Sequence, residues 1–480
     1  MIRMTLDEIA KVTGGRLVNA SPAVTVTGGV EYDSRKVGPG GLFVAFEGEK
    51  VDGHSFAAGV VAAGAAGVLS TRDTGQPGVV VEEPLAALAA LAHAVVERLP
   101  GLTIVGLTGS SGKTTTKDYI GQLLARLGPT IAPAGSLNNE LGFPYTVLQA
   151  TEQTRFLVLE MGARAIGHIR YLCEIARPRV GAVLNIGAAH IGMFGSVEGT
   201  ARAKGELVEA LPATGVAVLN ADDPLVAGMA SRTSARVLLT GESAEAAVRA
   251  TEVTVDGEGR AAYTLHVGEQ TGNVRLRVMG RHQVANTLAA AGVALSLGLE
   301  FGELVTALGE IGIVSSRRMD LFVRPDGVTV IDDTYNANPS STAAALNALA
   351  TMKADGRRVA VLGYMAELGE HERSGHEEVG RLAAELGVDR LVAVADNARP
   401  ILDGATTVEG WSGEAIFAAD QATALEIVRG DLRAGDVVLV KGSRYRTWDV
   451  VDGLRPGARS ERSEPHSRGL GQLSPEEGRP

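Results

Sequence analysis

The sequence predicts a three-domain protein of the α/β class, and three observations lead to this fold. A chain of 480 residues is too long for one hydrophobic core and is typical of two to four domains. Short β-branched apolar runs alternate with helical patterns in residues 100–318 and again in residues 319–456. Residues 1–99 carry a smaller α/β pattern. We therefore expect an N-terminal α/β domain, a central domain with a parallel sheet and a C-terminal Rossmann-like domain.

The last residues, 457–480, differ in composition from the rest of the chain. They are rich in Ser, Glu, Arg, Gly and Pro, and their only large apolar residues are Leu470 and Leu473. Such a segment buries too little surface to offset the entropy lost on ordering. We expect a disordered tail.

The composition also excludes several classes of protein. A formal net charge of −11 without a basic block argues against a nucleic-acid surface. No apolar run approaches a membrane span, and the N-terminus lacks the charged-then-apolar pattern of a secretion signal, so we expect no membrane insertion. The single cysteine, Cys173, excludes an intramolecular disulfide and suits a reducing compartment. Its apolar neighbours indicate a buried structural thiol, and we expect a cytoplasmic protein.

In the N-terminal domain, a short amphipathic helix is expected at residues 6–12 and a strand at residues 42–46. Two polar clusters lie near strand ends, one at residues 33–35 and one at residues 52–54. Binding groups often occupy such positions, but the spacing alone favours solvated turns. Both interpretations stay open at this stage.

The strongest motif of the chain lies at residues 106–115, at the start of the central domain. A buried strand at residues 102–107 leads into a glycine-rich turn, and a helix opens on Gly-Lys-Thr. This layout binds polyphosphates, because backbone N–H groups and the helix N-terminus face the anion. Lys113 would reach the terminal phosphates, and the Thr114 hydroxyl could bind Mg²⁺. The general pattern has glycine where this chain has Leu107, yet strand, loop and helix together favour a nucleoside triphosphate site over a plain turn.

Three more buried strands are expected in the central domain, at residues 156–159, 180–184 and 216–219. Ligands of parallel sheets bind beyond the carboxyl ends of the strands, so Glu160 and the loop of His190 are expected beside the phosphate loop. Taken singly, Glu160, His190 and Lys204 are better explained as an ordinary strand-end residue, a loop histidine and a solvated lysine.

The rest of the central domain changes pattern. Residues 247–280 alternate polar and apolar positions, which predicts a meander or flanking β-sheet. A helix is expected to begin near His282 and to carry Asn286. The C-terminal domain repeats the buried-strand pattern, with strands expected at residues 328–331, 359–362, 391–394 and 437–440.

Six motifs together resemble the Mur ligases of peptidoglycan synthesis over residues about 5–453. They lie at residues 108–117, 138–144, 160–162, 185–190, 332–339 and 441–444. The resemblance implies an ATP-dependent amide ligase. The string at residues 332–339 is most similar to the member that adds D-alanyl-D-alanine to UDP-N-acetylmuramoyl-tripeptide. The resemblance also implies that the reaction forms an acyl phosphate and releases ADP and phosphate.

The resemblance also assigns roles to individual residues. ATP would contact the phosphate loop together with residues across the domain hinge: Thr108, Gly109, Ser110, Ser111, Gly112, Lys113, Thr114, Thr115, Asn286, Arg318 and Asp333. The nucleotide-linked substrate and the dipeptide would contact a second set: Ser34, Arg35, Asp52, Gly53 and His54 at the uridine diphosphate, Asn138 and Asn139 at the muramoyl peptide, and Tyr335, Asn336 and Asn338 at the dipeptide.

The same resemblance implies a Mg²⁺ site at Thr114, Glu160, His190 and Lys204, with Lys204 carbamylated by CO₂. A carbamate is an anionic oxygen donor, which Mg²⁺ prefers over an ammonium group. Catalysis would depend on Lys113, Lys204, His190 and Glu160.

Some alternatives remain open. The chain could be a related ligase, either diaminopimelate-adding or folylpolyglutamate-forming, or a phosphate-loop switch that ligates nothing. Gln283 stands where many of these ligases have Asn, and Arg317 rivals Arg318 for the ATP contact. The string at residues 396–399 superficially matches a diaminopimelate-binding motif, but we expect a surface loop. We expect a monomer.

Overall fold

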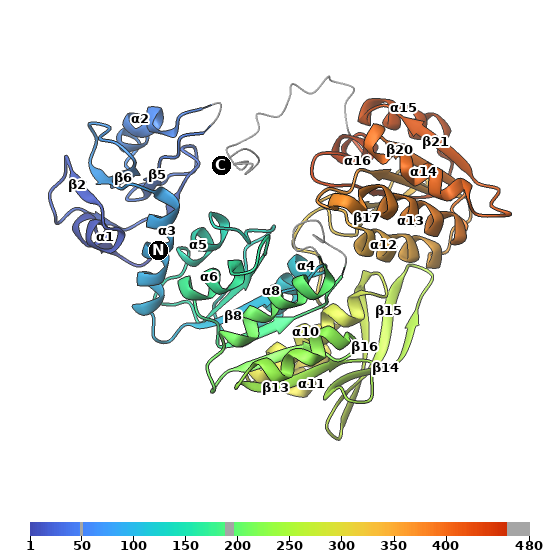
Figure 1. The fold of residues 1–480 in the computed structure, drawn as a ribbon, viewed down its shortest axis with the longest axis horizontal. Helices are drawn as coiled ribbons and strands as arrows, with labels where there is room; N and C mark the ends of the chain where they lie inside the picture. Colours follow the sequence, from blue (N-terminus) through green and yellow to red (C-terminus); the bar gives the residue numbers. More distant parts are fainter. Residues whose placement is uncertain (49–50, 188–195, 458–480) are drawn as a thin grey trace.

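The computed structural model describes residues 1–48, 51–187 and 196–457. It contains three α/β units, which Figure 1 shows following one another around a bend, with the central unit between the two others. The predicted three-domain α/β fold is confirmed. Residues 458–480 of the predicted tail and His190 lie outside the described residues, and the exact domain boundaries stay predictions. Within the described ranges, no helix combines the length and apolarity needed to cross a membrane.

The N-terminal unit is a five-stranded sheet with helices. Strands β4 to β7 run parallel and β2 antiparallel, and β1 and β3 form a separate pair. The elements are β1 (Met4–Thr5), α1 (Leu6–Thr13), β2 (Arg16–Val18), β3 (Thr25–Val26), β4 (Val30–Glu31), β5 (Leu42–Val44), α2 (Ala57–Ala62), β6 (Gly67–Ser70), β7 (Gly78–Val80) and α3 (Pro84–Glu97). Helix α1 begins at a capping box, in which Thr5 and Glu8 bond each other's backbone N–H groups.

The central unit is a nine-stranded sheet in the order β16-β15-β14-β13-β12-β11-β8-β10-β9. Its strands are β8 (Thr103–Thr108), β9 (Thr130–Ile131), β10 (Phe156–Glu160), β11 (Val180–Val183), β12 (Val216–Asn220), β13 (Arg236–Gly241), β14 (Val248–Val255), β15 (Arg260–Val267) and β16 (Gln270–Met279). The predicted meander is confirmed as β14–β16, which are antiparallel and extend the parallel sheet at one edge.

Helices cover both faces of this sheet. They are α4 (Lys113–Leu124), α5 (Gly142–Val147), α6 (His168–Ile175), α8 (Val197–Glu209), α9 (Pro224–Ala227), α10 (Gln283–Ser296) and α11 (Phe301–Leu308). Alternate residues of β8 point to opposite faces, so Val105 packs in the core with α4 and α10, whereas Ile104 packs in the other core. That second core continues into the N-terminal unit through α3, which fixes the two units together.

The C-terminal unit is a six-stranded sheet in the order β17-β18-β22-β19-β20-β21, parallel except for β17. Its elements are β17 (Asp320–Val323), β18 (Thr329–Asp333), α12 (Pro339–Thr351), β19 (Arg358–Gly363), α13 (Glu372–Glu385), β20 (Arg390–Val394), α14 (Arg399–Thr406), β21 (Glu414–Ala418), α15 (Gln421–Asp431), β22 (Val437–Lys441) and α16 (Trp448–Leu454). The carboxyl ends of β18, β19 and β22 meet at one edge, where ligands of such sheets bind.

Candidate functional site

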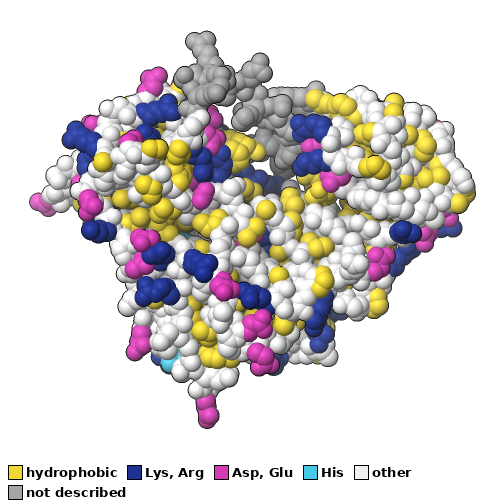
Figure 2. Space-filling view, turned by 180° about the vertical axis from the view of Figure 1, so that it is seen from behind, with side chains coloured by type: hydrophobic (Ala, Val, Ile, Leu, Met, Phe, Trp, Pro, Cys, Tyr) yellow, Lys and Arg dark blue, Asp and Glu magenta, His cyan; other side chains and the backbone are white. Residues whose placement is uncertain are grey.

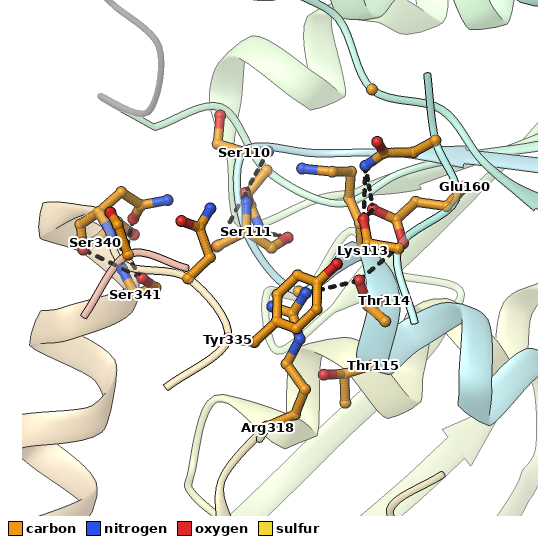
Figure 3. A pocket seen from close by; sticks show the side chains of 18 of the residues that line it. Ser110, Ser111, Lys113, Thr114, Thr115, Glu160, Arg318, Tyr335, Ser340 and Ser341 are labelled. Atoms are coloured by element: carbon orange, nitrogen blue, oxygen red, sulfur yellow. Dashed lines mark hydrogen bonds between the residues drawn. The ribbon is translucent and has the colours of Figure 1, made fainter. Parts of the chain in front are cut away.

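The site is a cavity of about 600 Å³ lined by residues of the central and C-terminal units. In the central unit, the phosphate loop and the end of β10 line the cavity. In the C-terminal unit, the loops after β18, β19 and β22 line it. Figure 3 shows the two walls, with Lys113 and Glu160 on one and Ser340 and Ser341 on the other. On the molecular face seen in Figure 2, basic and acidic side chains are interspersed.

The phosphate loop connects β8 to α4, as the sequence predicts. Gly112, at the N-terminus of α4, has a φ of 77°, and a Cβ atom there would lie 2.5 Å from Asn286 Oδ1. Glycine is therefore required both by the backbone conformation and by the close approach of α10. Residues 110–115 and Asn286 all line the cavity, whereas the Thr108 side chain is buried and donates to the Met161 carbonyl at 2.9 Å.

The amides of the loop converge on one acceptor. Ser110 N and Ser111 N donate to Asn185 Oδ1 at 3.1 and 2.9 Å, and Lys113 Nζ donates to the Gly109 carbonyl at 2.7 Å. Converging backbone N–H groups at a helix N-terminus form an anion-binding nest. The neutral side-chain oxygen of Asn185 thus occupies a position that suits a phosphate oxygen.

Oxygen atoms gather next to the loop, around Glu160 at the end of β10. Thr114 Oγ1 donates to Glu160 Oε2 at 2.8 Å, while Ser136 Oγ and Asn138 Nδ2 donate to Oε1 at 2.9 and 2.7 Å. Hydroxyl and carboxylate oxygens fit Mg²⁺, which takes few protein ligands and keeps waters and phosphates. Accordingly, no group of three or more His, Cys, Asp or Glu suited to a metal is found within the described residues.

Lys204 lies on α8 and is 2% exposed. Its Nζ has no hydrogen bond or ion pair with any described residue. Burial lowers the pKa of Lys204 well below its usual value, and the charge of Lys113 lowers it further. A lowered pKa favours the neutral amine, which is the form that reacts with CO₂. His190, expected beside it, lies outside the described residues.

The structure separates the two adjacent arginines at the domain hinge. Arg318 donates to Thr114 Oγ1 at 3.0 Å, and its guanidinium lies 4.1 Å from the centre of the Tyr335 ring (Figure 3). Arg317 instead forms an ion pair with Asp452 at 2.8 Å and stacks on Trp448. Of the two, only Arg318 lines the cavity.

Other hinge residues are paired among themselves. Asn286 Nδ2 donates to Gln283 Oε1 at 2.9 Å. Gln283, which stands where many of these ligases have Asn, therefore supplies a hydrogen-bond partner to Asn286. Asp333 Oδ2 pairs with Lys441 Nζ at 2.5 Å, and burial lowers the pKa of Lys441 while Asp333 opposes that change. Because both charges are buried together, neither Asp333 nor Lys441 is an isolated charge.

The C-terminal wall brings together the residues expected at the dipeptide. Tyr335, Asn336 and Asn338 all line the cavity. Asn338 also caps α12, since its side chain accepts from Ser341 N at 2.8 Å. Lys441 Nζ donates to the Asn336 carbonyl at 2.9 Å. Asn138 and Asn139 line the opposite wall.

The two polar clusters of the N-terminal unit do not line this cavity. Asp33 forms a two-point ion pair with Arg35 at 2.9 and 2.8 Å, which lowers the pKa of Asp33 to about 2. His54 is buried between Asp52 at 2.6 Å and the Thr71 hydroxyl at 3.0 Å, and its contact lowers the pKa of Asp52 to about 2. These bonds hold the turns in shape, and the roles of Ser34, Arg35, Asp52, Gly53 and His54 stay predictions.

The sequence interpretation gave no individual role to several lining residues, although Asn185 and Arg444 lie in two of the six motifs. Ser136 and Asn185 have only neutral side chains, and their roles depend on contacts between segments far apart in the chain. Glu367 and Arg444 lie beyond strands that were predicted, so the strand-end rule could have selected them. Residues 396–399 lie outside the cavity, with Arg399 paired to Asp396 at 2.9 Å. The expected loop is wrong, because Asp396–Ala398 form a short 3-10 helix that leads into α14.

Comparison with known proteins gives matches along most of the chain. The description "Mur ligase family, catalytic domain" matches residues 27–96. "Mur ligase middle domain" matches residues 107–294, and "Mur ligase, glutamate ligase domain" matches residues 317–444.

Individual relatives agree with these descriptions. The UDP-N-acetylmuramoyl-tripeptide–D-alanyl-D-alanine ligase of Mycobacterium tuberculosis is 47% identical, over 92% of this chain and 96% of the relative. A crystal structure of MurF from Acinetobacter baumannii is 34% identical with a TM-score of 0.83, covering 94% of this chain and 98% of that chain. MurF ligase from Thermotoga maritima in complex with ADP is 29% identical with a TM-score of 0.76, covering 89% and 96%. The chain belongs to the Mur ligase family.

Proposed function

We propose that the protein joins D-alanyl-D-alanine to UDP-N-acetylmuramoyl-tripeptide, with ATP as the second substrate. The observation that carries this proposal is the shared cavity, which has the phosphate loop on one wall and residues of the string at 332–339 on the other. It is supported by relatives of that name that align along almost the whole chain. The ADP complex of the Thermotoga maritima relative supports nucleotide binding by this chain.

The reaction proceeds in two steps. A carboxylate oxygen of the tripeptide attacks the γ-phosphorus of ATP, the bond to the β-phosphate oxygen breaks, and ADP leaves. The amine of the dipeptide then attacks the acyl phosphate, the amide bond forms, phosphate leaves and the amine loses a proton. The loop amides and Lys113 hold the phosphates in line, so catalysis is mainly positioning and charge neutralisation.

The residues around Glu160 complete the phosphate site. Thr114 and Glu160 would hold Mg²⁺, which neutralises phosphate charge when it is bound. Lys204, carbamylated, would add an oxygen donor, with His190 beside it. Arg318, Asn286 and Asp333 would contact ATP from the hinge, and closure of the two walls would keep water from the acyl phosphate.

The N-terminal unit would bind the uridine diphosphate end through Ser34, Arg35, Asp52, Gly53 and His54. Asn138 and Asn139 would contact the muramoyl peptide. We propose that the protein acts as a monomer. The single buried Cys173 and the nucleotide-linked substrate suit the cytoplasm.

The proposal is tested with a panel of amines. The enzyme is incubated with ATP and UDP-muramoyl-tripeptide, and the masses of the products are measured with D-alanyl-D-alanine, D-alanine or diaminopimelate. We expect product and phosphate release only with the dipeptide. Product from diaminopimelate and UDP-muramoyl-dipeptide, with none from D-alanyl-D-alanine, would assign the chain to another branch of the family. ATP turnover without any ligation would favour a nucleotide switch.

A further inference from the structure

The linker at residues 309–319 joins α11 of the central unit to β17 of the C-terminal unit. It is bound to α4, the helix that begins at the phosphate loop. Gln122 Nε2 donates to the Gly312 carbonyl and Gly312 N donates to Gln122 Oε1, each at 3.0 Å. One turn closer to the phosphate loop, Ser315 N donates to Asp118 Oδ2 at 3.0 Å. The linker is therefore fixed to two successive turns of α4.

Hydrogen bonds, more than apolar packing, hold this part of the linker. Ile313 and Val314 are 40% and 49% exposed, whereas Ser315 is 3% exposed. Its partner Asp118 is also buried and forms an ion pair with Lys117 at 2.9 Å. A buried ion pair is favourable only where further hydrogen bonds satisfy its atoms. The Ser315 amide supplies one such bond to the carboxylate.

The buried lysine holds a second segment, the loop that follows β9. Lys117 Nζ donates to the carbonyls of Pro133 and Gly135, the latter at 2.9 Å. Gly135 N donates to Ser315 Oγ at 2.9 Å, although the two residues lie 180 positions apart in the sequence. Ser315 thus joins two segments, because its amide binds α4 and its hydroxyl oxygen accepts from the loop after β9.

The next residue of this loop, Ser136, contacts Glu160. Ser136 Oγ donates to Glu160 Oε1 at 2.9 Å. On the other side of the carboxylate, Thr114 Oγ1 donates to Oε2 at 2.8 Å and accepts from Arg318 at 3.0 Å (Figure 3). Arg318 lies three residues after Ser315 in the linker. The linker therefore supports both oxygens of Glu160, one through the loop after β9 and one through Arg318.

We propose that Ser315 is a positioning residue for Glu160, because it fixes the loop that carries Ser136 and thereby orients the carboxylate. Ser315 does not line the cavity, so it acts through this loop and not on the ligand. The inference rests on the proposed function, in which Glu160 and Thr114 hold Mg²⁺. Since Mg²⁺ demands near-ideal octahedral geometry, a small rotation of the carboxylate weakens the site. The placement of the linker between the two units then sets the geometry of the Mg²⁺ site.

A Ser315 that only stabilised the linker would give a different result. Its loss would lower Tm and would weaken ADP binding equally with and without Mg²⁺. A residue that orients Glu160 affects ADP binding only when Mg²⁺ is present, because the carboxylate meets the nucleotide through the metal ion. The Mg²⁺ dependence of ADP binding therefore separates the two roles.

The test is calorimetric titration of ADP in Mg²⁺ and in EDTA, with wild type, Ser315→Ala, Ser136→Ala and the double variant. The quantity compared is the ratio of the Kd in EDTA to the Kd in Mg²⁺. Ser315→Ala removes the acceptor of Gly135 N but keeps the amide bond to Asp118. It should reduce the ratio about 2–10-fold, the size of one neutral hydrogen bond, and leave the Kd in EDTA unchanged. The double variant should lose no more than Ser136→Ala alone, because the effect passes through Ser136.

Ser316→Ala is the matched control, because Ser316 is the next residue of the linker, is exposed and does not line the cavity. It should keep the wild-type ratio. Equal weakening in EDTA and in Mg²⁺ for Ser315→Ala would overturn the inference, as would additive losses in the double variant. If ADP binding by wild type ignores Mg²⁺, the metal site of the proposed function itself fails. If wild type depends on Mg²⁺ and Ser315→Ala keeps the wild-type ratio, only this inference fails.

Discussion

Asn185 Oδ1 accepts a hydrogen bond from the Ser111 amide at 2.9 Å, so a side chain of the protein occupies the nest of the phosphate loop. A nucleotide phosphate must replace this oxygen. Asn185→Asp would place a negative charge in the nest, which binds the amides more strongly and repels phosphate. We expect the Kd for ADP to rise at least about 10-fold, the size of one charge-assisted contact.

Calorimetric titration of ADP into Asn185→Asp and Asn185→Ala checks this prediction. Asn185→Ala removes the competing oxygen and should bind ADP at least as well as wild type. Weaker binding in the Ala variant, with normal binding in the Asp variant, would show that Asn185 supports the loop instead of competing with the ligand.

Lys113→Ala should nearly abolish ligation without unfolding the protein. The Lys113 side chain borders the cavity. Within the described residues, its Nζ forms one hydrogen bond, to the Gly109 carbonyl, so little of the core depends on this side chain. Removing one group that stabilises transition-state charge lowers kcat about 10²–10³-fold. Circular dichroism and kcat are measured on the same preparation. A folded Lys113→Ala protein with near-normal kcat would contradict the assignment of the loop.

Arg317→Gln and Arg318→Gln form a matched pair of adjacent substitutions. Arg318 contacts Thr114, so its loss should lower kcat/KM for ATP with little change in Tm. Arg317 is bound to Asp452 and Trp448, so its loss should lower Tm and leave the KM for ATP unchanged. Thermal melts and ATP kinetics on both variants decide the matter, and the reverse pattern would refute the placement of these two side chains.

Lys204→Arg should be nearly inactive, because a guanidinium cannot form a carbamate but keeps the positive charge. Lys204→Ala should also be nearly inactive, and added short carboxylates should restore part of its activity by supplying an oxygen donor. Activity is measured with and without bicarbonate in CO₂-depleted buffer. An active Lys204→Arg protein that ignores bicarbonate would rule out carbamylation.

The lowered pKa of Lys204 also has a consequence for stability. Burial lowers the pKa of the folded Lys204, so between that pKa and about 10.4 the unfolded chain binds more protons there and stability rises with pH. Lys204→Met removes this dependence. Urea unfolding in CO₂-free buffer should show Met stabilising the protein most at neutral pH, with the difference shrinking toward pH 10. A difference independent of pH would contradict a lowered pKa of Lys204, and Lys353→Met, at an exposed site, is the control.

The sequence predicted the elements that local patterns specify. The phosphate loop was recognisable because a buried strand, glycines and an amphipathic helix occur in order at residues 102–127. The strand end at Glu160 was correctly expected beside the phosphate loop, since parallel strands bring their carboxyl ends to one edge. Asp333, which was assigned from the resemblance, lines the same cavity. Side chains that depend on distant contacts were not predictable in this way. Asn185, for example, accepts a hydrogen bond from Ser111, which lies 74 residues earlier in the sequence.

Arg317 and Arg318 show that side-chain contacts are equally hard to predict for residues adjacent in the sequence. Both are arginines in one hinge, and sequence alone left them as rivals. The backbone separates them, because Arg317 and Met319 take left-handed φ angles of 62° and 55° on either side of Arg318. These angles turn consecutive side chains in different directions. No propensity rule assigns such angles to Arg or Met, since they are set by the surrounding contacts.

Transfer of ¹⁸O from the substrate carboxylate tests the acyl phosphate, the central step of the proposed reaction, most directly. UDP-muramoyl-tripeptide labelled with ¹⁸O in its terminal carboxylate is ligated to D-alanyl-D-alanine with ATP, and the released phosphate is weighed by mass spectrometry. If the carboxylate attacks the γ-phosphorus, one ¹⁸O atom per turnover appears in inorganic phosphate and one remains in the new amide carbonyl. Amide formation with no ¹⁸O in the released phosphate would contradict the mechanism.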